Sequence, residues 1–178
     1  RSAGFNQVDL KAAKAHGLTV MRVPAYSPES IAEHAVAMIL SLVRNVHHQY
    51  NRVRNGNFSM DNLVGFTLRG RVAGIVGTGN IGRATARILK GFGCSLLGSD
   101  PYPHDEMTAI GMEYVEREEL FRRSDVIVLT APLTPETKHM VNSETLKLFK
   151  KGSVLINTGR GPLIDTKAAI VALKNLET

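Results

Sequence analysis

The sequence has few of the features that mark secreted, membrane or nucleic-acid-binding proteins. Its 178 residues include a single cysteine, Cys94, so no disulfide can form within the chain. The longest apolar run, residues 35–43, is far too short to cross a bilayer. Aromatic residues make up only 6%, and the basic residues behind the net charge of +6 are scattered, which does not favour nucleic-acid binding. We therefore expect a protein of the reducing cytoplasm that binds neither membrane nor nucleic acid.

The remaining composition is that of an ordinary globular domain with a real core, with 43% apolar and 21% charged residues. The basic balance suits a small anionic substrate or the pyrophosphate of a dinucleotide. The first residues, from Arg1, read like the middle of a sequence, and a helical pattern is barely closed at Thr178. We expect the chain to be part of a longer protein.

Short apolar runs alternate with helical patterns from residue 72 onward. The runs, which we expect to be strands, are residues 72–76, 95–99, 112–115, 126–130 and 154–157. The segments expected to be helical are residues 80–91, 104–110, 117–123, 143–150 and 166–175, the last capped by Asp165. Strands separated by helices indicate βαβ units, and hence an α/β fold with a doubly wound parallel sheet.

Other patterns precede this alternation. Residues 9–16 have a helical pattern, and residues 18–23 read as a short strand that Pro24 ends. Ser27 followed by Pro28 is a helix start, and the helix predicted from there runs to about Val53. Its apolar stripe consists of Ile31, Ala35, Met38, Ile39, Leu42 and Val46. A polar connection over residues 55–70 follows it.

Residues 77–82 read Gly-Thr-Gly-Asn-Ile-Gly, directly after a predicted strand and at the start of a predicted helix. That context is the one a dinucleotide-binding glycine motif needs. We expect Gly77 to form the tight turn, Gly79 to let the backbone approach a pyrophosphate, and Gly82 to let helix and strand pack closely. The helix N-terminus would then hold the pyrophosphate. A purely structural glycine turn is the alternative.

Asp100 closes the next predicted strand, 18 residues after Gly82. A carboxylate at that place can accept hydrogen bonds from an adenosine ribose and would repel a 2′-phosphate. No arginine follows it to receive such a phosphate, so NAD is favoured over NADP. The alternative is an aspartate that merely caps a helix or a loop.

Residues 157–161 read Asn-Thr-Gly-Arg-Gly after the fifth predicted strand, at the edge where ligands of parallel sheets bind. Arg160 could grip a carboxylate there through two parallel hydrogen bonds. Taken alone, Arg160 could equally be an ordinary surface arginine.

These motifs together resemble the D-isomer-specific 2-hydroxyacid dehydrogenase family, over essentially the whole chain. Residues 23–28, 32–35, 90–93, 100–103 and 132–135 resemble its D-lactate dehydrogenase branch. The resemblance implies an NAD-dependent oxidoreductase that transfers a hydride between NADH and a small 2-oxo acid, pyruvate being reduced to D-lactate. Two alternatives stay open. The substrate could be hydroxypyruvate, glyoxylate or a bulkier 2-oxo acid, or the protein could be a corepressor-like protein that senses NAD, because the fold alone does not separate an enzyme from such a protein.

The resemblance also implies site residues. Arg160 would hold the carboxylate and carbonyl of the 2-oxo acid as the catalytic arginine. Tyr26 would lie near the substrate, unless it is an aromatic packed between the domains in the hinge, residues 24–28. The further residues that match are, for the substrate loop, Ala3 and Gly4; for the pyrophosphate, Asn80 and Ile81; for the adenosine half, Ala131, Pro132 and Thr137; and for the nicotinamide side, Thr158, Gly159 and Arg160.

The family's catalytic histidine and its glutamate partner would lie downstream of this chain. None of the six histidines present is expected to replace that acid, and we expect no metal site. Residues 1–25 would be the end of a substrate domain, and residues 26–178 an NAD-binding domain that is incomplete at its C-terminal end. We also expect a homodimer or a dimer of dimers, built partly through the long helix that starts at Ser27.

Overall fold

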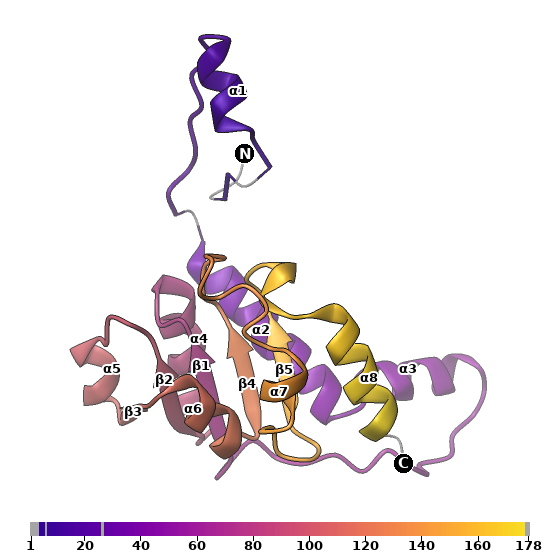
Figure 1. Cartoon of the computed structure of the whole chain (residues 1–178). Helices are drawn as coiled ribbons and strands as arrows, with labels where there is room; N and C mark the ends of the chain where they lie inside the picture. Colours follow the sequence, from indigo (N-terminus) through magenta and orange to yellow (C-terminus); the bar gives the residue numbers. More distant parts are fainter. Residues whose placement is uncertain (1–3, 6, 26, 177–178) are drawn as a thin grey trace.

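The computed structural model describes residues 4–5, 7–25 and 27–176, and its centre is a five-stranded parallel sheet (Figure 1). The strands run in the order β3-β2-β1-β4-β5. Their bounds are β1 Val72–Val76, β2 Ser95–Ser99, β3 Met112–Tyr114, β4 Val126–Leu129 and β5 Val154–Asn157. All five predicted strands are present, two of them one residue shorter than expected. The predicted α/β fold with a doubly wound parallel sheet is confirmed.

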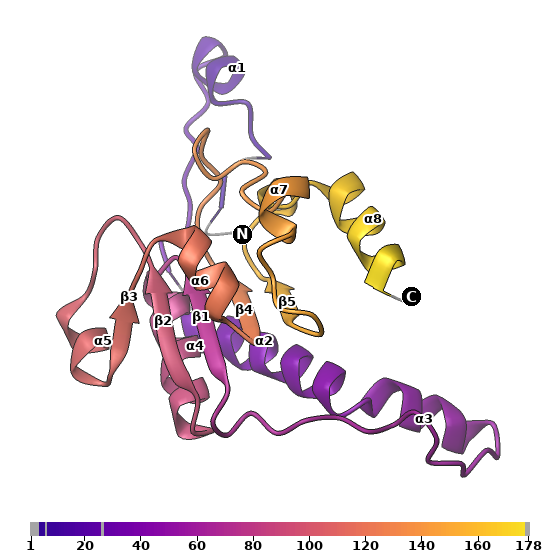
Figure 2. The same cartoon turned by 60° about the horizontal axis from the view of Figure 1, so that its bottom comes forward.

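Helices cover both faces of the sheet, as parallel sheets require (Figures 1 and 2). On one face α2 (Pro28–Val43) packs against α4 (Asn80–Gly91), and their apolar residues enclose Ile75 and Val128. On the other face α6 (Arg117–Arg123) buries Phe121 against Leu129. The strands thus point side chains into two separate cores, as strand alternation dictates.

The long helix predicted from Ser27 to about Val53 is broken, so this prediction is wrong in one respect. Ser27 caps it and Pro28 opens it as expected, but α2 ends at Val43, and α3 (Val46–Arg54) is a separate helix. The break is at Asn45, whose φ of 54° is left-handed.

A contact from outside the helix explains the break. The backbone of Gly65 passes so close to the end of α2 that a Cβ there would lie 1.8 Å from the carbonyl oxygen of Val43. Leu42 and Val46, predicted on the buried stripe, lie on either side of this turn and are about half exposed, with fractions of 47% and 52%.

The strand predicted over residues 18–23 is also wrong. In the part of the chain that is described, no strand pairs with it, and the segment lies away from the sheet (Figures 1 and 2). A strand needs a partner for its backbone groups, whatever its side-chain pattern. The preceding helix α1 (Leu10–Ala15) forms as predicted, capped by Asp9, and buries none of its residues.

The last predicted helices are present with altered bounds. α5 is Asp105–Ala109, and α8 is Thr166–Leu176, capped by Asp165, whose carboxylate accepts the N–H groups of Lys167 and Ala168. α7 covers only Ser143–Leu146, about one turn less than predicted. Beyond its end, Phe149 packs against Phe121 with ring centroids 4.9 Å apart and the rings tilted by 49°. A short 3-10 helix, η1 (Gly161–Leu163), precedes α8.

Across the described ranges, no helix is both long and apolar enough to span a membrane.

Candidate cofactor and substrate site

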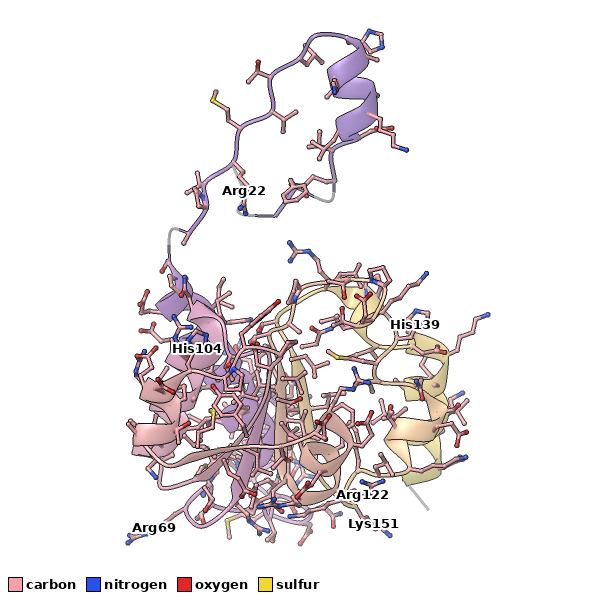
Figure 3. The ribbon with its side chains drawn as sticks, turned by 60° about the vertical axis from the view of Figure 1, so that its left-hand side comes forward. Arg22, Arg69, His104, Arg122, His139 and Lys151 are labelled. Carbon is pink, nitrogen blue, oxygen red and sulfur yellow. The ribbon has the colours of Figure 1, made fainter. Side chains whose placement is uncertain are left out.

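The carboxyl ends of the strands form one edge of the sheet, and this edge faces the N-terminal segment (Figure 1). The glycine loop follows β1, Asp100 follows β2, residues 130–137 follow β4, and residues 158–161 follow β5. His104 and His139 lie toward this edge, whereas Arg69, Arg122 and Lys151 lie at the opposite end of the domain (Figure 3). The structure therefore gathers the predicted site segments that it describes along one edge.

The three glycines of the loop have three different environments. Gly77 has a φ of 91°, and a Cβ on it would meet the backbone nitrogen of Ala131 at 2.6 Å. A Cβ on Gly82 would lie 2.0 Å from the carbonyl oxygen of Gly77. By contrast, a Cβ on Gly79 would have no atom within 4 Å. Gly77 and Gly82 are thus required by the packing of the protein itself, whereas the space at Gly79 is open to a ligand.

The N-terminus of α4 provides donors beside that open space. Gly79 is its N-cap and offers no side chain for capping, so the first N–H groups of this 12-residue helix are not capped from within. Asn80 is exposed and Ile81 is half-buried at the start of the helix. Backbone N–H groups and the helix dipole together favour an anion at this place.

Asp100 holds the glycine loop directly. Its Oδ2 accepts the N–H of Thr78 at 2.6 Å, and its Oδ1 accepts the N–H of Tyr102 at 2.9 Å. The alternative reading, an aspartate that orders a loop, is therefore part of what this residue does. An ionised carboxylate has about four acceptor positions, so these two bonds leave capacity for the hydroxyls of a ribose.

A polar cluster that the sequence did not predict lies beside Asp100. The Tyr114 hydroxyl donates to Oγ1 of Thr78 at 3.1 Å and accepts the N–H of His104 at 3.0 Å. Arg83 donates to the carbonyl oxygen of Thr78 at 3.0 Å and contacts Nε2 of His104 at 2.9 Å. Only the position of Arg83, directly after the third glycine, could have signalled this cluster.

The segment after β4 closes over the glycine loop. The Thr130 hydroxyl donates to the carbonyl oxygen of Gly77 at 2.5 Å, and Ala131 is buried beneath that glycine. The Thr137 hydroxyl donates to the carbonyl oxygen of Pro132 at 2.7 Å and accepts the N–H of Thr134 at 2.7 Å. Thr137 thus shapes the turn that carries Pro132.

The loop after β5 is ordered by its own asparagine. Asn157 accepts the N–H of Gly159 at 3.0 Å and donates from Nδ2 to the carbonyl oxygen of Arg160 at 2.9 Å. The N–H of Thr158 donates to Leu129 at 3.1 Å, so the loop stays against β4. Arg160 itself is exposed, at the carboxyl edge of the sheet.

A groove of about 260 Å³ joins the glycine loop to the hinge. Its lining comes from the hinge and the start of α2 on one side, and from Gly79, Asn80, Ile81 and Thr130 on the other. Gly4 lies in the N-terminal segment, where its carbonyl oxygen accepts Nε2 of Gln7 at 3.1 Å. Ala3 and Tyr26, both expected near the substrate, fall outside the described residues.

A family model matches this arrangement. Residues 36–177 match the model described as D-isomer specific 2-hydroxyacid dehydrogenase, NAD binding domain. The chain belongs to this family. The match covers the sheet and the helices on both of its faces from the middle of α2 onward, and the N-terminal segment and the start of α2 lie outside it.

Individual relatives agree with this assignment. The chain is 54% identical over 175 residues to the D-lactate dehydrogenase of Escherichia coli, covering 98% of the chain and 53% of that relative. The apo-structure of D-lactate dehydrogenase from Escherichia coli superposes with a TM-score of 0.94 at 53% identity, over 99% of the chain and 56% of that structure. The structure of D-lactate dehydrogenase from Aquifex aeolicus complexed with NAD and lactic acid superposes with a TM-score of 0.90 at 41% identity, over 98% of the chain and 53% of that structure.

The chain thus spans about half the length of the relatives it matches. Its described residues fit the NAD of the family name. Open space lies over Gly79 at the start of a long helix, and Asp100 ends the neighbouring strand with acceptor capacity remaining. No group of three or more potential metal ligands occurs within the described ranges. His47 and His48 lie exposed at the start of α3, in the segment predicted to be the end of one long helix.

Proposed function

We propose that this chain forms the NAD-binding part of an oxidoreductase that transfers a hydride between NADH and a small 2-oxo acid, with pyruvate reduced to D-lactate. The observation that carries the proposal is the meeting of three segments at one sheet edge. These are the open glycine loop at Gly79, the carboxylate of Asp100 and the Asn-Thr-Gly-Arg-Gly loop that ends with Gly161. The likeness to D-lactate dehydrogenases over nearly the whole chain supports it.

The cofactor half of the proposal assigns a place to each segment. The N–H groups of Asn80 and Ile81 bind the pyrophosphate, while Asp100 accepts the ribose hydroxyls. Ala131, Pro132 and Thr137 lie along the adenosine side, and Thr158 and Gly159 along the nicotinamide side. When bound, NADH supplies the hydride; the chain's residues orient it and exclude water.

The substrate half of the proposal rests on Arg160. Its guanidinium holds the carboxylate of the 2-oxo acid and polarises the carbonyl that is to be reduced. Gly4 and Ala3 contribute backbone N–H groups to the same carboxylate, and Tyr26 lies close to it. The proton comes from a histidine paired with a glutamate, and the family resemblance places both downstream of these residues.

Two domains are part of the same proposal. Residues 1–25 belong to a substrate domain, and residues 26–178 form the NAD-binding domain. In support, the N-terminal segment extends away from the sheet, and its apolar side chains, among them Leu18 and Met21, are exposed at 65% and 88% (Figure 1). The substrate would bind in the cleft between the domains, next to the groove at Gly79.

Steady-state assays of the full-length protein test the proposal. The panel contains pyruvate, hydroxypyruvate, glyoxylate and 2-oxoisocaproate, each with NADH and with NADPH. We expect the largest kcat/KM with pyruvate and NADH, and a chiral assay should find D-lactate. Higher kcat/KM with a bulkier acid would move the substrate assignment within the family. NADH binding without turnover of any acid would favour the sensing protein over the enzyme.

We also propose a homodimer, or a dimer of dimers, built partly through α3 and the connection after it. This arm, residues 46–64, has exposed large apolar side chains at Val46, Tyr50, Val53, Phe58, Met60 and Val64. Four of them, Val53, Phe58, Met60 and Val64, line one depression of about 410 Å³. Exposed apolar side chains that gather in this way are typical of an interaction site.

Light scattering at micromolar concentration should find at least a dimer. A charge placed in the arm by Val53→Lys should shift the protein toward the monomer, because the interface would then bury an unpaired ammonium. Leu173→Lys on α8 is the matched control, since Leu173 is exposed at 65% and Val53 at 57%. A monomeric unmutated protein would rule the proposal out.

A cytoplasmic location, which the sequence analysis expects, is likewise a proposal.

A further inference from the structure

A second arginine-based feature lies beside the proposed ribose site. Arg83, in the first turns of α4, has a side chain that is only 18% exposed. It donates to the carbonyl oxygen of Thr78, contacts His104, and donates to Oδ1 of Asn80 at 2.8 Å. A positive charge is thus fixed against the glycine loop.

Arg83 and Asp100, which carry opposite charges, both bond to the backbone of Thr78. Asp100 accepts the N–H of Thr78, and Arg83 donates to the carbonyl oxygen of Thr78. His104, which contacts Arg83, is four residues beyond Asp100 and is held by the hydroxyl of Tyr114. Any group added to the ribose at Asp100 would therefore come close to the side chains of Arg83 and His104.

Glu106 neutralises this positive charge. Its Oε1 lies 2.6 Å from Nε of Arg83, and its other oxygen pairs with Nη2 of Arg87, one turn further along α4. Glu106 is thus shared by two arginines that lie on the same side of α4. Without Glu106, both arginines would lose this carboxylate, and Arg83 would keep an unneutralised positive charge beside Thr78.

We infer that Glu106 is a second specificity-determining residue for the cofactor, which acts by neutralising Arg83 and Arg87 beside the ribose. Asp100 repels a 2′-phosphate directly, and Glu106 removes the cations that would otherwise attract it. The inference rests on the proposed function, because it assumes that the adenosine ribose binds at Asp100. It predicts that replacing Asp100 alone gives only part of the NADPH affinity that replacing both Asp100 and Glu106 gives.

A purely structural role for Glu106 makes a different prediction. If the carboxylate only fastens α5 to α4, its removal lowers stability and weakens NADH and NADPH alike. If it tunes the charge beside the ribose, its removal changes the ratio of the two dissociation constants. That ratio is therefore the quantity to measure.

The experiment is calorimetric titration of the full-length protein with NADH, NADPH and adenosine 2′,5′-bisphosphate. The variants are Asp100→Ala, Glu106→Gln and the double variant. The matched control adds Glu144→Gln to Asp100→Ala, since Glu144 is an exposed glutamate that pairs with Lys147 on α7, across the sheet. A triple variant adds Arg83→Met to the double variant.

We expect the double variant to bind NADPH about tenfold or more tightly than Asp100→Ala does, the gain typical of a charge-assisted contact. NADH affinity should change little, and added salt should reduce the gain. The triple variant should lose most of it, and the Glu144→Gln control should show none.

Equal NADPH affinity of Asp100→Ala and the double variant, with NADH binding intact, would refute the role of Glu106 and leave the proposed function standing. An equal gain in the Glu144→Gln control would refute it too, because net charge alone would then suffice. If the unmutated protein binds no NADH, the proposed function fails and this inference fails with it.

Discussion

Two glycines of the same loop should respond in opposite ways to a single added methyl group. Alanine at position 79 would place its Cβ with no atom within 4 Å, and the backbone there, with φ −61° and ψ −168°, suits any residue. Gly79→Ala should therefore leave stability unchanged or raise it by about 0.4–1 kcal/mol, through the less flexible unfolded chain. The added methyl would nevertheless occupy the space proposed for the pyrophosphate.

Alanine at position 82 meets the protein instead. Its Cβ would lie 2.0 Å from the carbonyl oxygen of Gly77 and 2.9 Å from the hydroxyl of Thr130. Because backbone atoms cannot move aside cheaply, α4 would have to shift by about 1 Å, and overpacking of this kind costs about 1–3 kcal/mol. Helix propensity would return up to about 1 kcal/mol of that cost, since position 82 lies in a helix.

The assay combines a binding curve with an unfolding curve for each variant of the full-length protein. We expect Gly79→Ala to raise the NADH dissociation constant about tenfold or more, as expected when close charge-assisted contacts to the pyrophosphate are lost, at an unchanged unfolding midpoint. Gly82→Ala should lower the midpoint. Gly91→Ala at the end of α4 is the control, since a Cβ there also has no atom within 4 Å. Unchanged NADH affinity in Gly79→Ala would refute the proposed position of the pyrophosphate.

Three further expectations follow from other residues. Arg160→Lys keeps the charge but loses the two-pronged contact, so kcat/KM for pyruvate should fall roughly 10- to 150-fold while NADH affinity changes much less; unaltered turnover would mean that Arg160 is not the substrate anchor. Burial acts to raise the pKa of Asp125, but bonds from the Val72 N–H and from Lys150 outweigh it and lower that pKa. Its contribution is present above the unfolded-state pKa and is lost as pH falls through the lower folded-state pKa. Asp125→Asn should thus cost on the order of 1 kcal/mol at pH 7, and urea titrations should show the difference shrinking as the pH falls below about 4. Burial raises the pKa of the Cys94 thiol, as does the nearby charge of Asp125, so a thiol reagent at pH 8 should react with Cys94 only after denaturation.

The strands and the glycine loop could be predicted because their signals are local. An apolar run such as that of β4 can only be a buried strand when helices flank it, and the glycine spacing fixes a turn whatever lies around it. The same locality explains the correct caps at Ser27 and Asp165, where the capping side chain bonds to N–H groups two or three residues ahead.

The errors arose where distant residues decide. The helix break at Asn45 depends on the approach of Gly65, and beyond the early end of α7 Phe149 packs against Phe121. The pattern of residues 18–23 satisfies a strand, but a strand also needs a partner, which lies outside any local window. Arg83 and Glu106 are 23 residues apart, and neither position alone indicates that they meet.

The polar bonds of the glycine loop explain why so little of the site depends on a ligand for its shape. The N–H of Gly77 donates to Ser99 at the end of β2, and the N–H of Thr78 donates to Asp100. From the other side, the hydroxyl of Thr130 after β4 holds the carbonyl oxygen of Gly77. The loop is therefore tied to both neighbouring strands before any dinucleotide arrives.

A ligand that meets a loop already ordered does not have to supply the free energy of ordering it, so its contacts at Gly79 count in full toward affinity. This also explains why Asp100 can serve the loop and the ribose together: one carboxylate fixes the backbone and presents its remaining acceptors at a defined distance from that backbone.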